Sequence, residues 1–281
     1  MYNATALGSQ APPIPDAVTF EVISVPRPDG SILPVHHFRP ATQKHGTPTA
    51  ALLHFHGGGF IAMTPDIAKG RLVQYVLNAG IQAFSVDYRL APEHPYPAAL
   101  DDGWTALAWI RENAGQLGIN TARIAIMGDS AGGAIAVSLA IRARDSQLSP
   151  PIAQQILCAP MLDDRTKRDI PCNFKVWDLQ DNITGWTAYL GKPPGGSDVP
   201  DTASPARVTD VSGLPSLYID TTQLDLFAEE NMEYGSRCVK AGIEVEIHVS
   251  PGLPHGFDSL MPSHRVSKQY EEHRERVMRN L

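Results

Sequence analysis

The sequence predicts an α/β fold with a mostly parallel sheet of eight strands, helices on both sheet faces and a small lid. Short, continuous apolar runs alternate with amphipathic segments along most of the chain. This alternation is typical of parallel strands that are buried on both faces and connected by helices. Ahead of it, two segments of largely alternating polarity are separated by Pro28-Asp29-Gly30, which predicts an antiparallel hairpin.

The predicted elements follow in chain order. Residues 18–25 and 32–38 form the hairpin, and six apolar runs follow as buried strands at residues 50–55, 81–86, 124–127, 156–159, 217–220 and 245–249. Helical spacing lies between them, most clearly at residues 99–113 and 226–241, and a charged amphipathic helix is predicted at 263–281. Ligands of such sheets bind beyond the carboxyl ends of the strands.

One domain, residues 1–281, accommodates these elements. A lid is expected from two segments that interrupt the alternation of strands and helices. Residues 1–16 are rich in proline and alanine with weak periodicity, and residues 163–213 form a long insert between two strands. The insert contains Trp177, Trp186 and Tyr189, followed by a loop-forming cluster at 191–197. An aromatic insert of this length predicts a cover over the site rather than another layer of sheet.

Composition narrows the classes of partner and the cellular location. Lys and Arg number 23 against 30 Asp and Glu, and this net charge of −7 argues against nucleic acid or an anionic membrane as the main partner. No run approaches the roughly 18 apolar residues that span a bilayer, and the N-terminus has no secretory pattern. Cys158, Cys172 and Cys238 are odd in number and widely spaced, unlike a disulfide framework or a zinc site. A cytoplasmic protein acting on a small molecule is expected, with a homodimer left open.

The segment Gly128-Asp129-Ser130-Ala131-Gly132 lies between an apolar run and a helical pattern. A strand, a Gly-x-Ser-x-Gly turn and a helix form a nucleophile elbow, in which small flanking residues allow the tight bend that exposes the serine. The helix N-terminus then points backbone N–H groups at the site, where they favour developing negative charge. Ser130 is therefore the predicted nucleophile, although the pentamer alone is a weak signal.

A second glycine-rich segment, His56-Gly57-Gly58-Gly59-Phe60, follows the strand that ends at Phe55. Its glycines can present backbone N–H groups to a ligand oxygen and, with the amide of Ala131, form an oxyanion hole. The alternative is a flexible turn, but the position after a strand and upstream of the elbow favours the oxyanion hole. His56 is expected to orient the loop. A metal bound by His54 and His56 is not expected, because no carboxylate cluster accompanies them.

A serine hydroxyl needs a base, and the base needs an acid to hold its tautomer. His255 lies in Pro251-Gly252-Leu253-Pro254-His255-Gly256-Phe257, a loop after the last predicted strand. Among the other histidines, His36, His37 and His248 lie in strand patterns, and His264 and His273 lie in the polar C-terminal helix. Asp225, at the end of a strand and the start of a helix, is the favoured acid, and the chain order serine, acid, histidine fits the α/β-hydrolase fold. Asp220 is the alternative, since an acid at a helix start can simply be a cap.

Together these segments resemble the hormone-sensitive-lipase-like α/β hydrolases, also called GDXG lipolytic enzymes. The resemblance spans residues 54–257 and includes a further match at residues 86–99. It implies that Gly58, Gly59 and Ala131 donate to the oxyanion, with His56, Gly57 and Asp129 as supporting motif residues. It also implies a buried ion network of Asp87, Arg89 and Glu93. The family's proline after the catalytic acid is replaced here by Leu226, while the first acidic position of the pattern is kept as Asp225.

The resemblance implies a serine carboxylesterase that acts on short- to medium-chain acyl esters, among them acetyl esters, without a metal or organic cofactor. Two alternatives stay open. An amidase or arylformamidase would use the same fold, because the lid and the leaving group decide between them. A small-molecule receptor is the other, since the plant gibberellin receptors resemble this family but lack its catalytic histidine, whereas His255 is present here.

Overall fold

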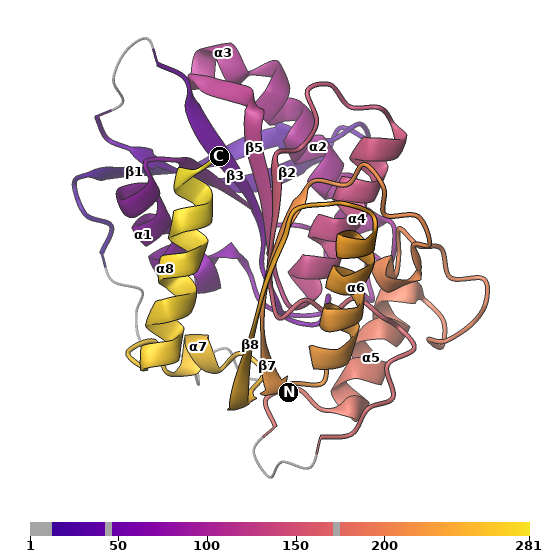
Figure 1. Cartoon of the computed structure of the whole chain (residues 1–281). Coiled ribbons are helices and arrows are strands. Elements are labelled where there is room, and N and C mark those ends of the chain that lie inside the picture. Colours follow the sequence, from indigo (N-terminus) through magenta and orange to yellow (C-terminus); the bar gives the residue numbers. More distant parts are fainter. Residues whose placement is uncertain (1–12, 43–46, 171–174) are drawn as a thin grey trace.

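A central twisted sheet with helices on both faces organises the molecule (Figure 1). The computed structural model describes residues 13–42, 47–170 and 175–281. Within these ranges the strands of the single sheet are β1 Val18–Pro26, β2 Ile32–Pro40, β3 Thr49–Phe55, β4 Gln82–Val86, β5 Ile119–Asp129, β6 Gln154–Cys158, β7 Ser216–Leu224 and β8 Val245–Pro254. Their spatial order is β1-β2-β4-β3-β5-β6-β7-β8.

The first strands form the antiparallel part of the sheet. β1 pairs with β2 and β2 pairs with β4 in antiparallel register, and all further pairs from β4 to β8 are parallel. Neighbouring residues in β3 explain why its sequence is continuously apolar. Leu52 and Leu53 point to opposite faces of the sheet, and both are fully buried. The predicted eight-stranded, mostly parallel α/β fold is confirmed.

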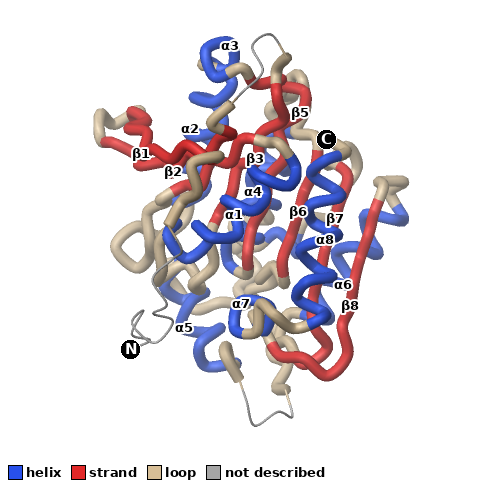
Figure 2. Tube along the Cα trace, turned by 90° about the vertical axis from the view of Figure 1, so that its left-hand side faces the viewer, coloured by secondary structure: helices blue, strands red, loops and turns tan. Residues whose placement is uncertain are grey.

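The helices cover the two faces unequally. They are α1 Lys69–Ala79, α2 Ala98–Glu112, α3 Ala114–Leu117, α4 Ala131–Asp145, α5 Leu179–Leu190, α6 Ala228–Lys240, α7 Phe257–Leu260 and α8 Arg265–Arg279, with short 3₁₀ turns η2 Pro65–Ala68 and η3 Pro205–Arg207. Helices α1 and α8 lie together over one face, while α2, α4 and α6 cover the other (Figures 1 and 2). The predicted C-terminal helix therefore packs on its own domain.

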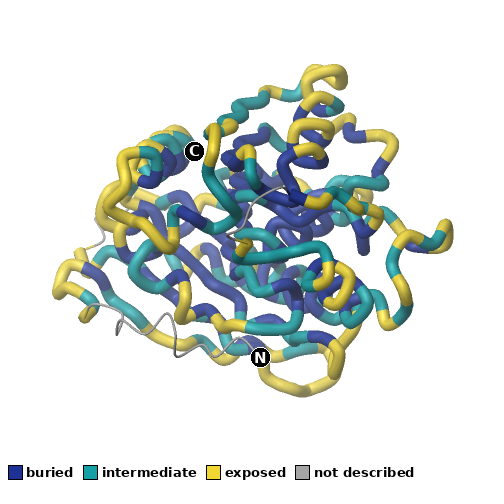
Figure 3. The backbone as a smooth tube through the Cα atoms, turned by 90° about the horizontal axis from the view of Figure 1, so that it is seen from below, coloured by how far each residue is buried: buried dark blue, intermediate teal, exposed yellow. Residues whose placement is uncertain are grey.

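Helix α4 passes through the core and is buried almost all round, from Ala131 to Ala143. Because it lies between the sheet and its neighbour α2, it needs no polar face. Figure 3 looks onto the molecule from below Figure 1 and shows buried backbone through the centre, with exposed segments around the rim. A rigid, buried helix therefore holds Ala131, which follows directly after Ser130.

The two segments expected to form the lid differ in how far the structure describes them. In the described part of 163–213, α5 and η3 are present and no strand joins the sheet. Residues 1–12, most of the expected N-terminal contribution, lie outside the described residues, as does Cys172. No described helix combines the length and the apolar character needed to cross a membrane.

Candidate active site

The turn between β5 and α4 forces Ser130 into a strained backbone conformation. Its φ of 51° and ψ of −116° are rare for a residue with a side chain. The surroundings fix this turn, because the amide of Ser130 donates to the carbonyl of Cys158 at 2.9 Å and Met161 donates to the carbonyl of Ser130 at 2.9 Å. Gly132 is required for close approach, since a β-carbon there would overlap the carbonyl of Phe55.

Ser130, His255 and Asp225 come together from three separate segments into one hydrogen-bonded chain. His255 Nε2 lies 3.1 Å from Ser130 Oγ, and His255 Nδ1 lies 2.7 Å from Asp225 Oδ2. The tautomer that fits has Nδ1–H donating to the carboxylate, which leaves Nε2 to accept the serine hydroxyl proton. Asp225 is fully buried, and its second oxygen accepts from the amide of Phe227 at 2.9 Å. This geometry allows His255 to take a proton from Ser130.

The electrostatics at His255 favour its protonated form. Burial alone lowers the pKa of the imidazole, but the charge and hydrogen bond of Asp225 outweigh it. Asp258 and Asp129 add to the same effect, and the pKa of His255 is raised above its ordinary value of 6.5. An imidazole in this setting can stabilise the positive charge that it acquires when it removes a proton.

The glycine-rich loop lies against the elbow, as an oxyanion hole requires. A β-carbon on Gly57 would lie 3.5 Å from the β-carbon of Ser130. Gly59 has a φ of +61°, and a β-carbon on it would overlap the indole of Trp177. Ala131 is the first residue of α4, so its amide belongs to the N–H groups that have no partner within the helix. The backbone around Ser130 thus combines glycine amides and a helix N-terminus.

Substituting Gly59 by alanine tests whether this loop supports turnover. The added β-carbon collides with Trp177 and displaces the loop, so we expect kcat to fall about 10²-fold, as when one oxyanion donor is lost. Gly80→Ala is the matched control, because Gly80 has a similar φ of +68° with no atom within 4 Å of the added carbon. Equal steady-state kcat values for the two variants would contradict this assignment of the loop.

His56 is buried, and its side-chain contacts are with the glycine loop and with Tyr88. Its Nδ1–H donates to the carbonyl of Gly57 at 2.7 Å, and its ring stacks on Tyr88 with centroids 4.3 Å apart. Tyr88 also donates its hydroxyl proton to the carbonyl of His56 at 2.8 Å. Burial lowers the pKa of His56 to about 4, so the ring is neutral at physiological pH. It is arranged to fix the backbone of the loop.

Asp129, the residue before the serine, is held by side chains from β3 and α1. Its carboxylate accepts from His54 Nε2 at 2.9 Å and pairs with the guanidinium of Arg71 from α1. Burial alone would raise the pKa of Asp129, but Arg71 and His54 outweigh it and hold that pKa below the ordinary value. His54 Nδ1 accepts from the hydroxyl of Ser85 at 2.8 Å, so both ring nitrogens of His54 have protein partners.

Asp220, the alternative acid, has a different partner. Its two oxygens accept from the buried guanidinium of Arg274 on α8, each at 2.7 Å. Arg274 also pairs with Asp258 at 3.0 Å and with Glu271 at 2.8 Å. Of the two carboxylates considered from sequence, Asp225 is the one in contact with His255. Arg274 connects the strand that precedes Asp225 with the helical turn that follows His255.

The ion network expected from Asp87, Arg89 and Glu93 is wrong in its acidic partners. Arg89 donates to Asp102 on α2 at 2.9 and 3.0 Å, and Arg27 shares the same carboxylate at 2.6 Å. Asp102 is fully buried between Arg27 and Arg89, whereas Glu93 lies exposed in the turn before α2.

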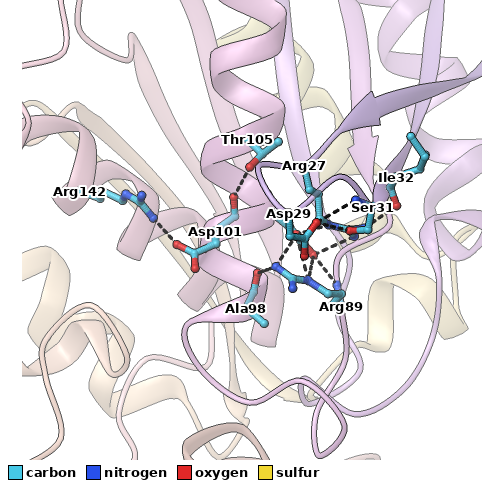
Figure 4. Close-up of polar contacts among 10 residues, drawn as sticks. Arg27, Asp29, Ser31, Ile32, Arg89, Ala98, Asp101, Thr105 and Arg142 are labelled. Atoms are coloured by element: carbon cyan, nitrogen blue, oxygen red, sulfur yellow. Dashed lines mark hydrogen bonds and ion pairs between the residues drawn. The ribbon is translucent and has the colours of Figure 1, made fainter.

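Figure 4 shows Arg27 and Arg89 side by side, with Arg142 paired to Asp101 nearby. A surface cavity of about 350 Å³ opens over this network, lined in part by Trp104, and Ser130, Asp225 and His255 do not contribute to its walls.

Sequence reasoning missed the charged side chains that support the site from a distance. Arg71, Asp102 and Arg274 all lie on helices and are separated in sequence from their partners. A lone charged residue in an amphipathic helix is typical of a solvated face. No local signal distinguishes it from one that turns inward.

The sheet, the elbow and the adjoining glycine loop define an α/β hydrolase. A family model described as "alpha/beta hydrolase fold" matches residues 52–259, and the chain therefore belongs to this family. Within it, the chain falls in the esterase branch that resembles hormone-sensitive lipase.

Similar proteins carry esterase names. "Esterase LipI" of Mycobacterium tuberculosis is 37% identical over 222 residues, which cover 78% of this chain and 68% of the relative. "Carboxylesterase NlhH" of the same species is 34% identical over 232 residues, covering 80% and 71%. Among solved structures, "Bacterial Heroin Esterase" has a TM-score of 0.88 at 35% identity and covers 94% of this chain and 84% of its own.

Proposed function

We propose that this protein is a serine carboxylesterase. Ser130 Oγ attacks the ester carbonyl carbon while His255 Nε2 takes the hydroxyl proton, and Asp225 holds the resulting imidazolium. The amides of Gly58, Gly59 and Ala131 stabilise the oxyanion of the tetrahedral intermediate. His255 then protonates the departing alkoxide, and an acyl group remains on Ser130. Water, activated by the same imidazole, releases the carboxylic acid and restores the hydroxyl.

The observation that carries this proposal is the continuous chain from Ser130 Oγ through the imidazole to the buried Asp225 carboxylate. It lies directly beside a glycine loop and a helix N-terminus, so a base and oxyanion donors flank the same oxygen. The esterase names of the relatives support hydrolysis of a carboxylic ester. A triad of this kind works without a metal or an organic cofactor. Turnover is therefore expected to be the same with and without EDTA.

We propose short- to medium-chain acyl esters, including acetyl esters, as substrates. The support is the crowding of the glycine loop by the described part of 163–213, which we propose acts as the lid. The indole of Trp177 lies over Gly59, and a β-carbon on Gly185 of α5 would lie 2.8 Å from the carbonyl of Gly59. Phe60, next to Gly59, stacks on Tyr189 of α5 with ring centroids 4.0 Å apart. Because these aromatic side chains crowd the loop that we propose binds the oxyanion, small acyl groups are expected to fit best.

A panel of p-nitrophenyl esters of increasing acyl length, assayed beside N-formylkynurenine, tests the proposal. Turnover highest for acetyl to medium-chain esters, with little for the formamide, is the expected result. Faster cleavage of N-formylkynurenine would establish an arylformamidase instead. A chain inert toward both that still binds a small organic acid tightly would be a receptor.

The pH dependence follows from the pKa of His255. The imidazole must be neutral to accept the serine proton, so kcat/KM is low below its pKa and rises as the pH passes through it. Because Asp225 raises the pKa of His255, the midpoint of this acid limb is expected above pH 6.5. Measuring kcat/KM of p-nitrophenyl acetate across pH, corrected for spontaneous hydrolysis, checks it. A midpoint clearly below 6.5 would show that Asp225 does not raise the pKa of the working base.

A further inference from the structure

A cluster of metal-ligating side chains lies outside the active site, between the edge strand β8 and helix α8. Glu246 and His248 are two apart on β8 and so face the same side of the sheet, and His273 comes from α8. One potential ligand atom from each residue lies within 4.8 Å of the other two. We propose that Glu246, His248 and His273 bind a divalent transition metal ion, for which Zn²⁺ is the suitable probe.

The donor set fits such an ion. Two imidazoles and a carboxylate are ligands that Zn²⁺ accepts, with a fourth position left for water. His248 Nε2 lies 2.6 Å from Glu246 Oε1, and the imidazoles of His248 and His273 are stacked with centroids 4.2 Å apart, so one ring must turn out of the stack for both to bind the same ion. An ion would replace the proton that His248 Nε2 and Glu246 Oε1 share. Nδ1 of His273 is buried and has no hydrogen-bond partner among the described residues, so the free imidazole leaves a polar atom unsatisfied.

The charges around the donor atoms also suit a cation. Glu246 supplies a carboxylate beside His248, and Glu272 is a further acidic side chain near His273.

Arg276 would compete with a metal ion for the carboxylate of Glu246. Its guanidinium pairs with the Glu246 carboxylate, and Arg279, one turn further along α8, pairs with Glu275 instead. The Arg276 side chain is 46% exposed, so it can return to water at little cost when an ion takes its place. Removing Arg276 is therefore expected to raise the affinity for the metal ion, whereas removing a ligand is expected to lower it.

The cluster is separate from the proposed catalytic residues. His248 is in register with Asp220 on β7, which aligns through Cys158 with Asp129 on β5. The three strand spacings between His248 and Asp129, the residue before Ser130, correspond to about 14 Å. An ion here would tie the edge strand to α8, and its ligands can be changed without touching Ser130, Asp225 or His255. The inference does not depend on the proposed esterase activity.

Calorimetric titration of ZnCl₂ into the full chain tests the site, with four variants alongside the unaltered protein. One ion per chain is expected. Because even outer-shell partners of a metal are worth about tenfold in affinity, H273A and the closer isostere H273Q should each weaken binding by more than about tenfold. Arg276→Gln should bind Zn²⁺ more tightly, and Arg279→Gln, the matched control, should behave like the unaltered chain.

A second readout is the melting temperature with and without Zn²⁺, which should rise for the unaltered chain and for Arg279→Gln but not for H273A or H273Q. A cooperative melting transition without added metal verifies that each variant is folded. The proposal is overturned if the unaltered chain shows no saturable Zn²⁺ binding, if the His273 variants bind it equally well, or if Arg276→Gln leaves the affinity unchanged.

Discussion

Ser130→Ala is expected to lower kcat/KM for p-nitrophenyl acetate by about 10⁴-fold or more, because it removes the atom that we propose forms the acyl enzyme. The remaining oxyanion donors and the imidazole cannot replace a covalent intermediate. The substitution should leave the fold intact, since the strained turn is fixed by backbone contacts to Cys158 and Met161 rather than by the hydroxyl.

Ser146→Ala is the matched control for this experiment. Ser130 and Ser146 cap opposite ends of the same helix, α4, and Ser146 is exposed. Its alanine variant should keep full turnover and a similar melting temperature. Activity of Ser130→Ala within tenfold of the unaltered chain would exclude Ser130 as the nucleophile.

Asp225→Asn should have the second largest effect, a loss of about 10⁴-fold in kcat/KM. An asparagine amide can donate to Nδ1 of His255, which would place the ring proton on Nε2 and leave no acceptor for the Ser130 hydroxyl. The charge that stabilises the imidazolium is lost as well. Steady-state assays with protein concentration corrected for the folded fraction measure the loss.

The comparison with Asp220→Asn separates the two acids that the sequence offered. Asp220 pairs with the buried Arg274, so its substitution should mainly lower the melting temperature, with a much smaller loss of turnover per folded molecule. A larger loss of turnover from Asp220→Asn than from Asp225→Asn would transfer the role of the acid to Asp220.

The parts of the site that the sequence predicts are those encoded in contiguous segments. The elbow is specified by small residues next to Ser130 between a strand and a helix, and His56-Gly57-Gly58-Gly59 follows a strand in the same local way. The fold was predictable for a related reason. Buried parallel strands are continuous apolar runs, and helices with one apolar face lie between them.

The acid and the ion networks depend on distances that no local pattern reports. Asp220 lies in the middle of β7 and Asp225 directly after it, and the packing of α8 against that strand directs Asp220 to Arg274. The expectation for Glu93 failed because it paired charges that are close in sequence, whereas Arg89 finds Asp102 on the helix that follows. Arg71 and Asp129 are 58 residues apart and meet only because α1 packs on the sheet.

Covalent labelling with a fluorophosphonate ester tests the central claim most directly, since an activated serine displaces its fluoride and becomes phosphonylated. Intact-mass spectrometry followed by peptide mapping should show one adduct per chain, located on Ser130, with activity lost in proportion to labelling. Labelling should slow strongly in Asp225→Asn. A fully active labelled chain, or an adduct on another residue that accounts for the inactivation, would contradict the assignment of Ser130, His255 and Asp225 as one catalytic unit.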